Sequence, residues 1–279
     1  MELESQLDGF MKRGLGVAAL SYDSPEVLKD FASRRHITYP LLSDPESKVI
    51  RGFGLLNDID YPVGNFAHGV PYPGTFITDA KGVIQSKFFE KAYAERQTAS
   101  AILAAAGAPA TEGVTELKTP QFVLKTSASS GAAAPGQRVA LILDFEMVKD
   151  MHAYAKGEHA YRPLTLSLDP NPLITPHEVI LPKAVRYTFE PLKETVPVYV
   201  GSFRVLQDVT VSGPSKEMQE LLKAESPSIE MTGTLTYQVC SHTLCYAPGK
   251  LAVKWMLRLV PLDRERAPEA LRRKPPSAP

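Results

Sequence analysis

The sequence has little cysteine, no excess of charge and no long apolar run. Only two of its 279 residues are cysteines, and 31 basic side chains balance 31 acidic ones. A chain without net charge has no electrostatic reason to bind nucleic acid, so we expect no nucleic-acid partner. No run approaches the ~20 apolar residues of a membrane-spanning helix, so we expect no membrane span. The start, MELESQLDGF, lacks a basic segment before an apolar one and does not read as a secretory signal.

The first part of the chain alternates helix patterns with strand patterns. Apolar side chains at helical spacing predict helices over residues 4–14 and 23–36. The run GVAALSY at 16–22 is typical of a buried strand. GTFITDAKGVIQSKFF at 74–89 predicts a β-hairpin, and residues 94–107 predict a closing helix. This alternation predicts an α/β domain.

The second part is almost entirely β. Short runs rich in branched and aromatic residues lie between prolines and polar turns, which predicts a β-sandwich. We therefore expect four segments: an α/β domain at 1–108, a linker at 109–115, a sandwich at 116–263 and a disordered tail at 264–279.

Cys240 and Cys245 lie between two strand patterns, with apolar and polar residues alternating on both sides. If the intervening SHTL is a hairpin loop, the two residues face each other across the ladder. Facing Cα atoms lie ~4.5–5.5 Å apart, within reach of a disulfide. The spacing therefore favours a disulfide at a loop tip that can open and close.

Four readings of the pair remain open: a structural staple, metal ligands, two buried thiols or a redox centre. A zinc site needs about four ligands, and His242 is the only other candidate nearby, so we expect no metal. A loop tip flanked by Ser, His and Pro is poorly placed to be buried core. We favour a redox pair, with Cys240 and Cys245 as the reactive residues.

The stretch TYQVCSHTLCYAP at 236–248 resembles the N-terminal domain of the thiol:disulfide interchange protein DsbD. The resemblance covers roughly residues 116–262. It implies an immunoglobulin-like sandwich that carries electrons from a membrane partner to periplasmic acceptors through such a cysteine pair. The residues that match the motif are Tyr237, Gln238, Cys240, Cys245, Tyr246 and Pro248.

In that family a cap loop lays an aromatic ring over the disulfide. The stretch VPVYVGSFRV at 196–205 occupies the corresponding place, which makes Tyr199 the candidate cap; an ordinary strand aromatic is the alternative. The resemblance also makes Tyr237, Tyr246 and Pro248 candidate supporting residues. The chain departs from the family in its shorter loop between the cysteines and in lacking acidic residues beside the cap aromatic, which leaves partner choice open.

The first part resembles the alkyl hydroperoxide reductase and redoxin branch of the thioredoxin-like fold. LLSDP at 41–45 and PGTFITDAKG at 73–82 carry the resemblance. Pro73 matches the cis-proline that this family places beside its active site; a proline at a strand start is the alternative. The resemblance implies a reactive cysteine at the amino end of the first helix, where the helix dipole stabilises a thiolate.

This part of the chain contains no cysteine, so we expect no peroxidase chemistry from it. The resemblance also implies a first strand between the strands at 16–22 and 74–78, and the sequence has none. Those two strands must then pair directly or leave ladder groups open. We hypothesise an amino-terminal truncation; a degenerate domain that became a scaffold is the alternative.

The favoured function is thiol–disulfide exchange through Cys240 and Cys245, with a thiol or disulfide protein as partner and no cofactor. One alternative is a non-enzymatic interaction module with a structural disulfide. The other is a piece of a peroxidase whose nucleophile lies outside this sequence. An exchange module suggests the bacterial periplasm, although no export signal is present.

Overall fold

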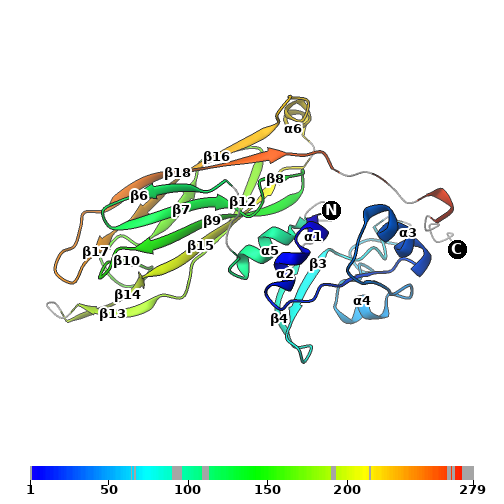
Figure 1. Ribbon diagram of the computed structural model, residues 1–279, viewed down its shortest axis with the longest axis horizontal. Coiled ribbons are helices and arrows are strands. Elements are labelled where there is room, and N and C mark those ends of the chain that lie inside the picture. Colours follow the sequence, from blue (N-terminus) through cyan, green and yellow to red (C-terminus); the bar gives the residue numbers. More distant parts are fainter. Residues whose placement is uncertain are drawn as a thin grey trace. The chain divides into compact units, whose positions relative to one another are not determined.

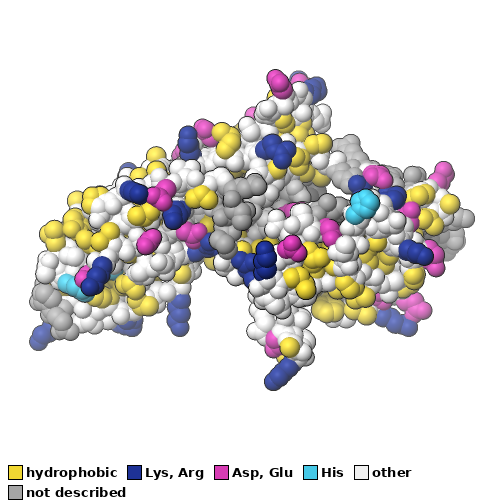
Figure 2. All heavy atoms as spheres, viewed as in Figure 1, with side chains coloured by type: hydrophobic (Ala, Val, Ile, Leu, Met, Phe, Trp, Pro, Cys, Tyr) yellow, Lys and Arg dark blue, Asp and Glu magenta, His cyan; other side chains and the backbone are white. Residues whose placement is uncertain are grey.

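The computed structural model describes residues 2–63, 65, 67–89, 96–108, 113–189, 193–213, 215–262, 265 and 268–271. Contacts divide the chain into two compact units. The first comprises Met1–Ala99 with Leu262–Pro279, and the second comprises Ser100–Pro261. Among the described helices, none is long and apolar enough to cross a bilayer. Figure 2 shows acidic and basic side chains interspersed on one face.

The first unit is mixed α/β. Its elements are α1 (Glu2–Ser5), α2 (Leu7–Met11), β1 (Ala19–Ser21), α3 (Pro25–Arg35), β2 (Leu41–Ser43), α4 (Lys48–Gly52), β3 (Gly74–Thr78), β4 (Ile84–Phe89), β5 (Arg96–Gln97) and the 3-10 turn η1 (Glu269–Leu271).

Helix α3 begins and ends where its sequence predicts. The Ser24 hydroxyl accepts a hydrogen bond from the backbone N–H of Val27, and Pro25 occupies the first turn. His36 ends the helix in the left-handed conformation, with φ of 52°. Leu28 points from α3 into the unit and is buried.

Strands β1 to β4 form two separate sheets. β1 pairs with β2 in parallel, and β3 pairs with β4 as the predicted antiparallel hairpin. Within the described residues no ladder joins β1 to β3. Direct pairing of these two strands, which was one of the two expected outcomes, is therefore not observed among the described residues.

The second unit is rich in sheet (Figure 1). Its elements are α5 (Ala99–Ala105, whose first residue belongs to the other unit), β6 (Thr115–Lys118), β7 (Phe122–Ala128), β8 (Ala132–Ala133), β9 (Gln137–Met147), β10 (His152–Tyr154), β11 (Thr165–Leu168), β12 (Ile174–Ile180), β13 (Val185–Phe189), β14 (Glu194–Val200), β15 (Ser202–Val211), α6 (Lys216–Leu221), β16 (Ser228–Tyr237), β17 (Val239–Cys240) and β18 (Gly249–Leu259).

Three sheets enclose one apolar core in this unit. Their strand orders are β12-β15-β9-β7-β6, β11-β16-β18-β8 and β13-β14-β10-β17. β18 alternates buried and exposed residues, as its sequence predicts, and Trp255 lies on the buried face at 3% exposure. Fully buried residues such as Leu124, Leu141, Leu235 and Leu257 come from strands of two of the sheets. The predicted β-sandwich is observed.

Strands β12 and β14 each contain a proline. Pro176 lies in β12, which is the edge strand of its sheet. Pro197 lies in β14, where its carbonyl accepts a hydrogen bond from the N–H of Ala155. A proline can lie in a β-ladder only where no neighbouring carbonyl requires a hydrogen bond from the N–H that proline lacks. Tertiary pairing therefore decides these two strands.

Helix α5 packs on the sandwich. Ala101 and Ala104 contact Ala140, Ile142 and Leu206 in one buried cluster. The sequence assigns this helix to a first domain ending at residue 108, whereas the boundary between the compact units falls after residue 99. The predicted linker and tail lie largely outside the described residues.

The Arg204 side chain fastens the end of α5 to the sheet. Its guanidinium donates to both carboxylate oxygens of Asp144, at 2.6 and 2.8 Å. It also donates to the carbonyls of Ala104 at 3.3 Å and Ala108 at 2.5 Å. The planar guanidinium thus donates hydrogen bonds to one carboxylate and to two carbonyls at the end of a helix.

We expect Arg204→Lys to destabilise the second unit, because an ammonium cannot make all four contacts. The free energy of unfolding should fall by about 1–3 kcal/mol. Urea titration followed by the fluorescence of Trp255, the only tryptophan, measures it. Arg258→Lys on the exposed face of β18 is the control. Equal losses in the two variants would contradict the assigned role.

Candidate functional site

The cysteine pair lies where one chain segment passes from one sheet to another. β16 runs beside β18, and after Gln238 the same segment continues as β17 beside β10. The Gln238 carbonyl accepts from the Tyr154 N–H at 3.2 Å. Its side-chain amide donates to the carbonyl of Tyr246 at 3.1 Å and accepts from the N–H of Arg162 at 2.9 Å. Gln238 therefore stabilises both the point where the chain passes between the sheets and the segment that follows Cys245.

The predicted hairpin and disulfide are both observed. Cys240 and Cys245 form an isolated antiparallel bridge with a Cα–Cα distance of 4.1 Å and a disulfide between them. The N–H of Ser241 donates to the carbonyl of Leu244 at 2.8 Å, and the Ser241 hydroxyl accepts from the N–H of Leu244 at 3.0 Å. The four-residue loop is thus closed by its own hydrogen bonds.

The two sulfurs lie in different environments. Cys240 is buried, at 1% exposure, in a cluster with Tyr154, Val196 and Val198. Cys245 is exposed. An incoming thiolate can therefore approach Cys245, whereas Cys240 lies beneath packed side chains. This asymmetry rules out two inert buried thiols as the description of the pair.

The ring against the disulfide is that of Tyr154. Its hydroxyl donates to the Cys240 sulfur at 3.1 Å and lies 3.6 Å from the Cys245 sulfur. The ring stacks on Tyr161 with centroids 4.1 Å apart. Burial, followed by the neighbouring Tyr161, raises the pKa of Tyr154 well above its usual range. The hydroxyl therefore stays protonated and available as a donor.

His152 lies opposite Cys240 in the β10–β17 ladder. It is 2% exposed, and its ring lies 4.3 Å from the ring of Tyr187. Burial, followed by the charge of His242, lowers the pKa of His152 from 6.5 to about 4. His152 is therefore neutral near pH 7.

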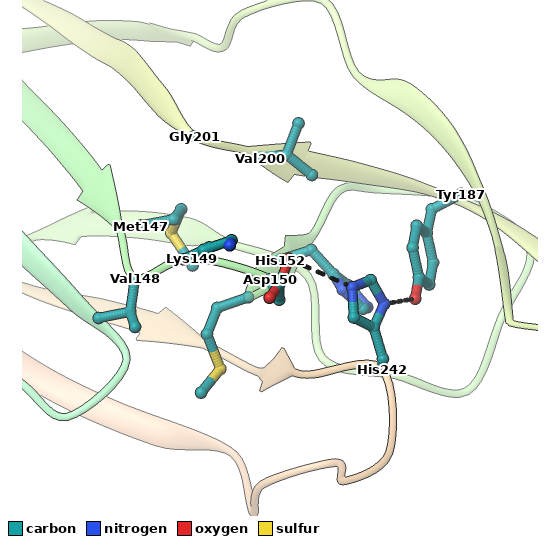
Figure 3. Close-up of a pocket in the computed structure, with 10 residues that line it drawn as sticks. Met147, Val148, Lys149, Asp150, His152, Tyr187, Val200, Gly201 and His242 are labelled. Atoms are coloured by element: carbon teal, nitrogen blue, oxygen red, sulfur yellow. Dashed lines mark hydrogen bonds and ion pairs between the residues drawn. The ribbon is translucent and has the colours of Figure 1, made fainter.

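His242, in the loop between the cysteines, reaches two other segments (Figure 3). Its Nδ1 lies 2.7 Å from the Tyr187 hydroxyl on β13, and its Nε2 lies 3.4 Å from the Asp150 carboxylate between β9 and β10. These three residues line a hollow of about 270 Å³ together with His152 and the neighbouring Lys149. The loop is therefore anchored from outside as well as from within.

Tyr199, the candidate cap, is not brought to the disulfide. Side chains of paired residues in an antiparallel ladder share a face, and neighbours along a strand alternate. Ala153 pairs with both Tyr199 and Val239, so these three share the face opposite Cys240. Tyr199 packs in the sandwich core, 5.1 Å from the ring of Phe203. A strand replaces the expected cap loop, and Tyr154 supplies the aromatic contact instead.

Tyr237 and Tyr246 support the hairpin from opposite sides. The Tyr237 ring covers Gly249, where a Cβ would come within 2.6 Å of the ring, and packs edge-on against Phe122 at 4.9 Å. The N–H of Tyr246 donates to the carbonyl of Val239 at 3.0 Å, which closes the ladder before the bridge. Both residues therefore shape the backbone that carries the sulfurs.

The two prolines lie apart from the sulfurs. Pro248 is exposed and lines a shallow depression with Arg162 and Lys250. Pro73 lies in the other unit, directly before β3. The described residues contain no cis peptide bond, so the expected cis-proline at residue 73 is trans. The strand-start alternative describes Pro73 better.

The residues that the motif did not single out are Asp150, His152, Tyr154 and Tyr187. They come from segments 58 to 95 residues before Cys245, and no spacing links them to the cysteines. Alternation in HAY could have indicated that His152 and Tyr154 share a face, but not which face. Among the described residues no group of three or more His, Cys, Asp or Glu could hold a metal ion.

The depressed pKa of His152 predicts loss of stability in acid. Below pH 6.5 the unfolded chain takes up a proton at His152 and the folded protein does not, until about pH 4. Stability should therefore fall as the pH falls through this window. We expect His152→Gln to flatten that part of the pH profile, measured by urea unfolding through Trp255. His68→Gln, in the other unit, should keep the wild-type slope, and an unchanged slope in His152→Gln would contradict the assignment.

Each half of the chain matches a different family. Residues 1–87 match the model of the AhpC/TSA family. A putative peroxiredoxin of Mycobacterium tuberculosis (strain H37Rv) is 34% identical over 83 residues, which are 30% of this chain and 52% of that protein. Peroxiredoxin Bcp of Escherichia coli (strain K12) is 31% identical over 86 residues, 31% of this chain and 54% of Bcp. The chain thus spans about half the length of these curated relatives.

Residues 119–255 match the model of the N-terminal region of the thiol:disulfide interchange protein DsbD. The reduced DsbD N-terminal domain of Neisseria meningitidis has a TM-score of 0.32 at 17% identity, covering 50% of this chain and 88% of that one. The N-terminal periplasmic domain of ScsB from Proteus mirabilis has a TM-score of 0.35 at 13% identity, covering 50% of this chain and 49% of that one. The chain joins a segment of AhpC/TSA type to a segment of the DsbD N-terminal type that carries its only disulfide.

Proposed function

We propose that this protein carries out thiol–disulfide exchange through Cys240 and Cys245, as a redox relay to or from another thiol protein. The observation that carries the proposal is the disulfide with one buried and one exposed sulfur. The family matches support the same chemistry, since both families are named for thiol-dependent reactions.

We infer the roles of the two cysteines from their difference in exposure. A thiolate of a partner dithiol protein attacks the sulfur of Cys245, forming a mixed disulfide, and Cys240 leaves as a thiolate that takes up a proton. The second thiolate of the partner then attacks the partner's sulfur in the mixed disulfide and releases Cys245 as a thiolate. Two electrons pass from the partner to the pair, and the partner ends as a disulfide. The reverse sequence would pass them on.

The Tyr154 hydroxyl stabilises the leaving group in the first step. A thiol of lower pKa is a better leaving group. A hydrogen bond donated to the thiolate lowers the pKa of that thiol. Tyr154 donates to the sulfur of Cys240, which is the one that must leave. The stack on Tyr161 and the bond from the Tyr161 hydroxyl to Glu194 at 2.9 Å keep the ring in place.

The first unit supplies no thiol, because the chain has no cysteine outside the pair. The AhpC/TSA match supports a redoxin-type, thioredoxin-like unit there. We infer that this unit serves in recognition of a redox partner and that peroxide reduction does not run on this chain alone. The whole chain would then combine a thiol relay with a partner-binding redoxin scaffold.

The reduction potential of the pair separates a relay from a structural staple. We expect it to lie clearly above about −300 mV, whereas structural disulfides of secreted proteins lie below that value. Equilibration of the full chain in glutathione or dithiothreitol buffers, followed by alkylation and mass measurement, gives the value. A potential below about −300 mV would leave only an interaction module with a structural bridge.

Single cysteine variants test which sulfur is attacked. Cys240→Ser leaves the exposed thiol of Cys245, and Cys245→Ser leaves the buried thiol of Cys240. We expect the first variant to react with an aromatic disulfide reagent at least tenfold faster, because reactivity requires access. Reaction of both variants at the same rate in the folded protein would overturn the assignment.

Tyr154→Phe removes the donor and keeps the ring. We expect disulfide exchange with a small thiol to slow by about tenfold, which corresponds to about 1.4 kcal/mol of lost leaving-group stabilisation. Stopped-flow measurement of reduction by dithiothreitol gives the rate. Tyr199→Phe is the matched control, because Tyr199 lies on the face opposite Cys240. Equal rates in Tyr154→Phe and the wild type would contradict the role of the hydroxyl.

A further inference from the structure

We propose that His242 is a positioning residue that holds the loop of the opened pair in place and thereby sets how readily the disulfide re-forms. The inference rests on the proposed exchange function and deepens it. It concerns three residues, His242, Tyr187 and Asp150, which we call the loop clamp.

The loop clamp connects three segments that are distant in sequence. His242 lies in the middle of the four residues between the cysteines. Tyr187 lies on β13, and Asp150 lies in the turn between β9 and β10. The distances of 2.7 Å to the Tyr187 hydroxyl and 3.4 Å to the Asp150 carboxylate engage both ring nitrogens at once (Figure 3). The hydroxyls of Ser241 and Thr243, by contrast, bond within the loop.

Both anchors are held independently of the loop. Tyr187 pairs with Val196 in the β13–β14 ladder and packs against the buried ring of His152. Asp150 has φ of 65°, a left-handed conformation that the short polar side chains Asp and Asn accept more readily than others. The segment carrying Asp150 is tied by the hydrogen bond from the Met151 N–H to the Val148 carbonyl at 3.0 Å. Opening the disulfide therefore leaves the anchors where they are.

The clamp forms more readily while the disulfide is closed than after it has opened. The oxidised loop is closed covalently, so binding His242 to its anchors costs little chain entropy. In the dithiol the loop gains freedom, and only internal hydrogen bonds and the clamp keep the thiol of Cys245 near that of Cys240. The cost of ordering a short segment is on the order of 1 kcal/mol per residue. The clamp thus raises the effective concentration of one thiol at the other.

The sign of the effect on the potential follows by linkage. A contact that is stronger in the oxidised form than in the dithiol favours the oxidised form by the difference. Removing the clamp therefore makes the disulfide easier to reduce and raises its potential. A side chain that merely supported the fold would stabilise both forms equally and leave the potential unchanged.

The test measures the equilibrium constant of the pair against glutathione in the full chain at pH 7. We expect His242→Ala to lower the constant for disulfide formation by about tenfold, equivalent to about 30 mV in potential. Tyr187→Phe and Asp150→Ala each remove one anchor, and we expect about threefold for each. Thr243→Ala, in the same loop, is the matched control and should keep the wild-type value, since the Thr243 hydroxyl meets only Ser241, at 3.5 Å.

A double-mutant cycle adds a second criterion. If Tyr187 acts through His242, adding Tyr187→Phe to His242→Ala should change the constant no further. Additive effects, or a wild-type constant in both His242→Ala and Tyr187→Phe, would overturn the clamp.

The outcome is separable from that of the proposed function. A wild-type pair that equilibrates with glutathione but never exchanges with a protein dithiol would refute the relay, while the variant shifts would still support the clamp. Normal exchange with unshifted variants would refute the clamp and leave the relay in place.

Discussion

The site depends on the short ladders that β10 makes with β14 and β17. Because strand neighbours alternate between faces, these two ladders decide which side chains meet. One face carries His152, Tyr154 and Cys240, and the other carries Ala153 and Tyr199. A shift of one residue in either ladder would move the tyrosine hydroxyl away from the sulfurs and bring the core aromatic to them. Everything chemical about the pair follows from this register.

The asymmetry of the disulfide is a consequence of where the chain changes sheets. Cys240 is the last residue of a strand that is paired and covered, so its sulfur lies inside. Cys245 belongs to the return of the hairpin, and only its bridge to Cys240 ties it to the ladder, so the residue is exposed. Under the proposed exchange, the buried Cys240 would be the leaving group and the exposed Cys245 the residue attacked. The Tyr154 hydroxyl lies beside the sulfur of Cys240.

The two cysteines of the chain both lie in its second half. The half that matches peroxiredoxins has no thiol, and the half that matches the DsbD N-terminal region has both. Helix α5, which the sequence assigns to the first half, packs on the sandwich because its alanines fit against Ala140 and Ile142 and because Arg204 binds the carbonyls at its end. Helix α5 lies between the two matched ranges, and its packing partner is the sandwich.

Local pattern determined the α/β and β halves, the helix begun by Ser24, the hairpin at the cysteines and the assignment of Trp255 to the core. These features depend on caps, turns and alternation, which act over a few residues. Only the tertiary structure decided that Tyr154 rather than Tyr199 touches the disulfide and that His242 is anchored from outside its loop. The alternation of a strand shows that neighbouring side chains point to opposite faces. Which of the two faces meets the sulfurs depends on ladders between segments that are far apart in the chain. No local spacing of residues encodes the register of those ladders.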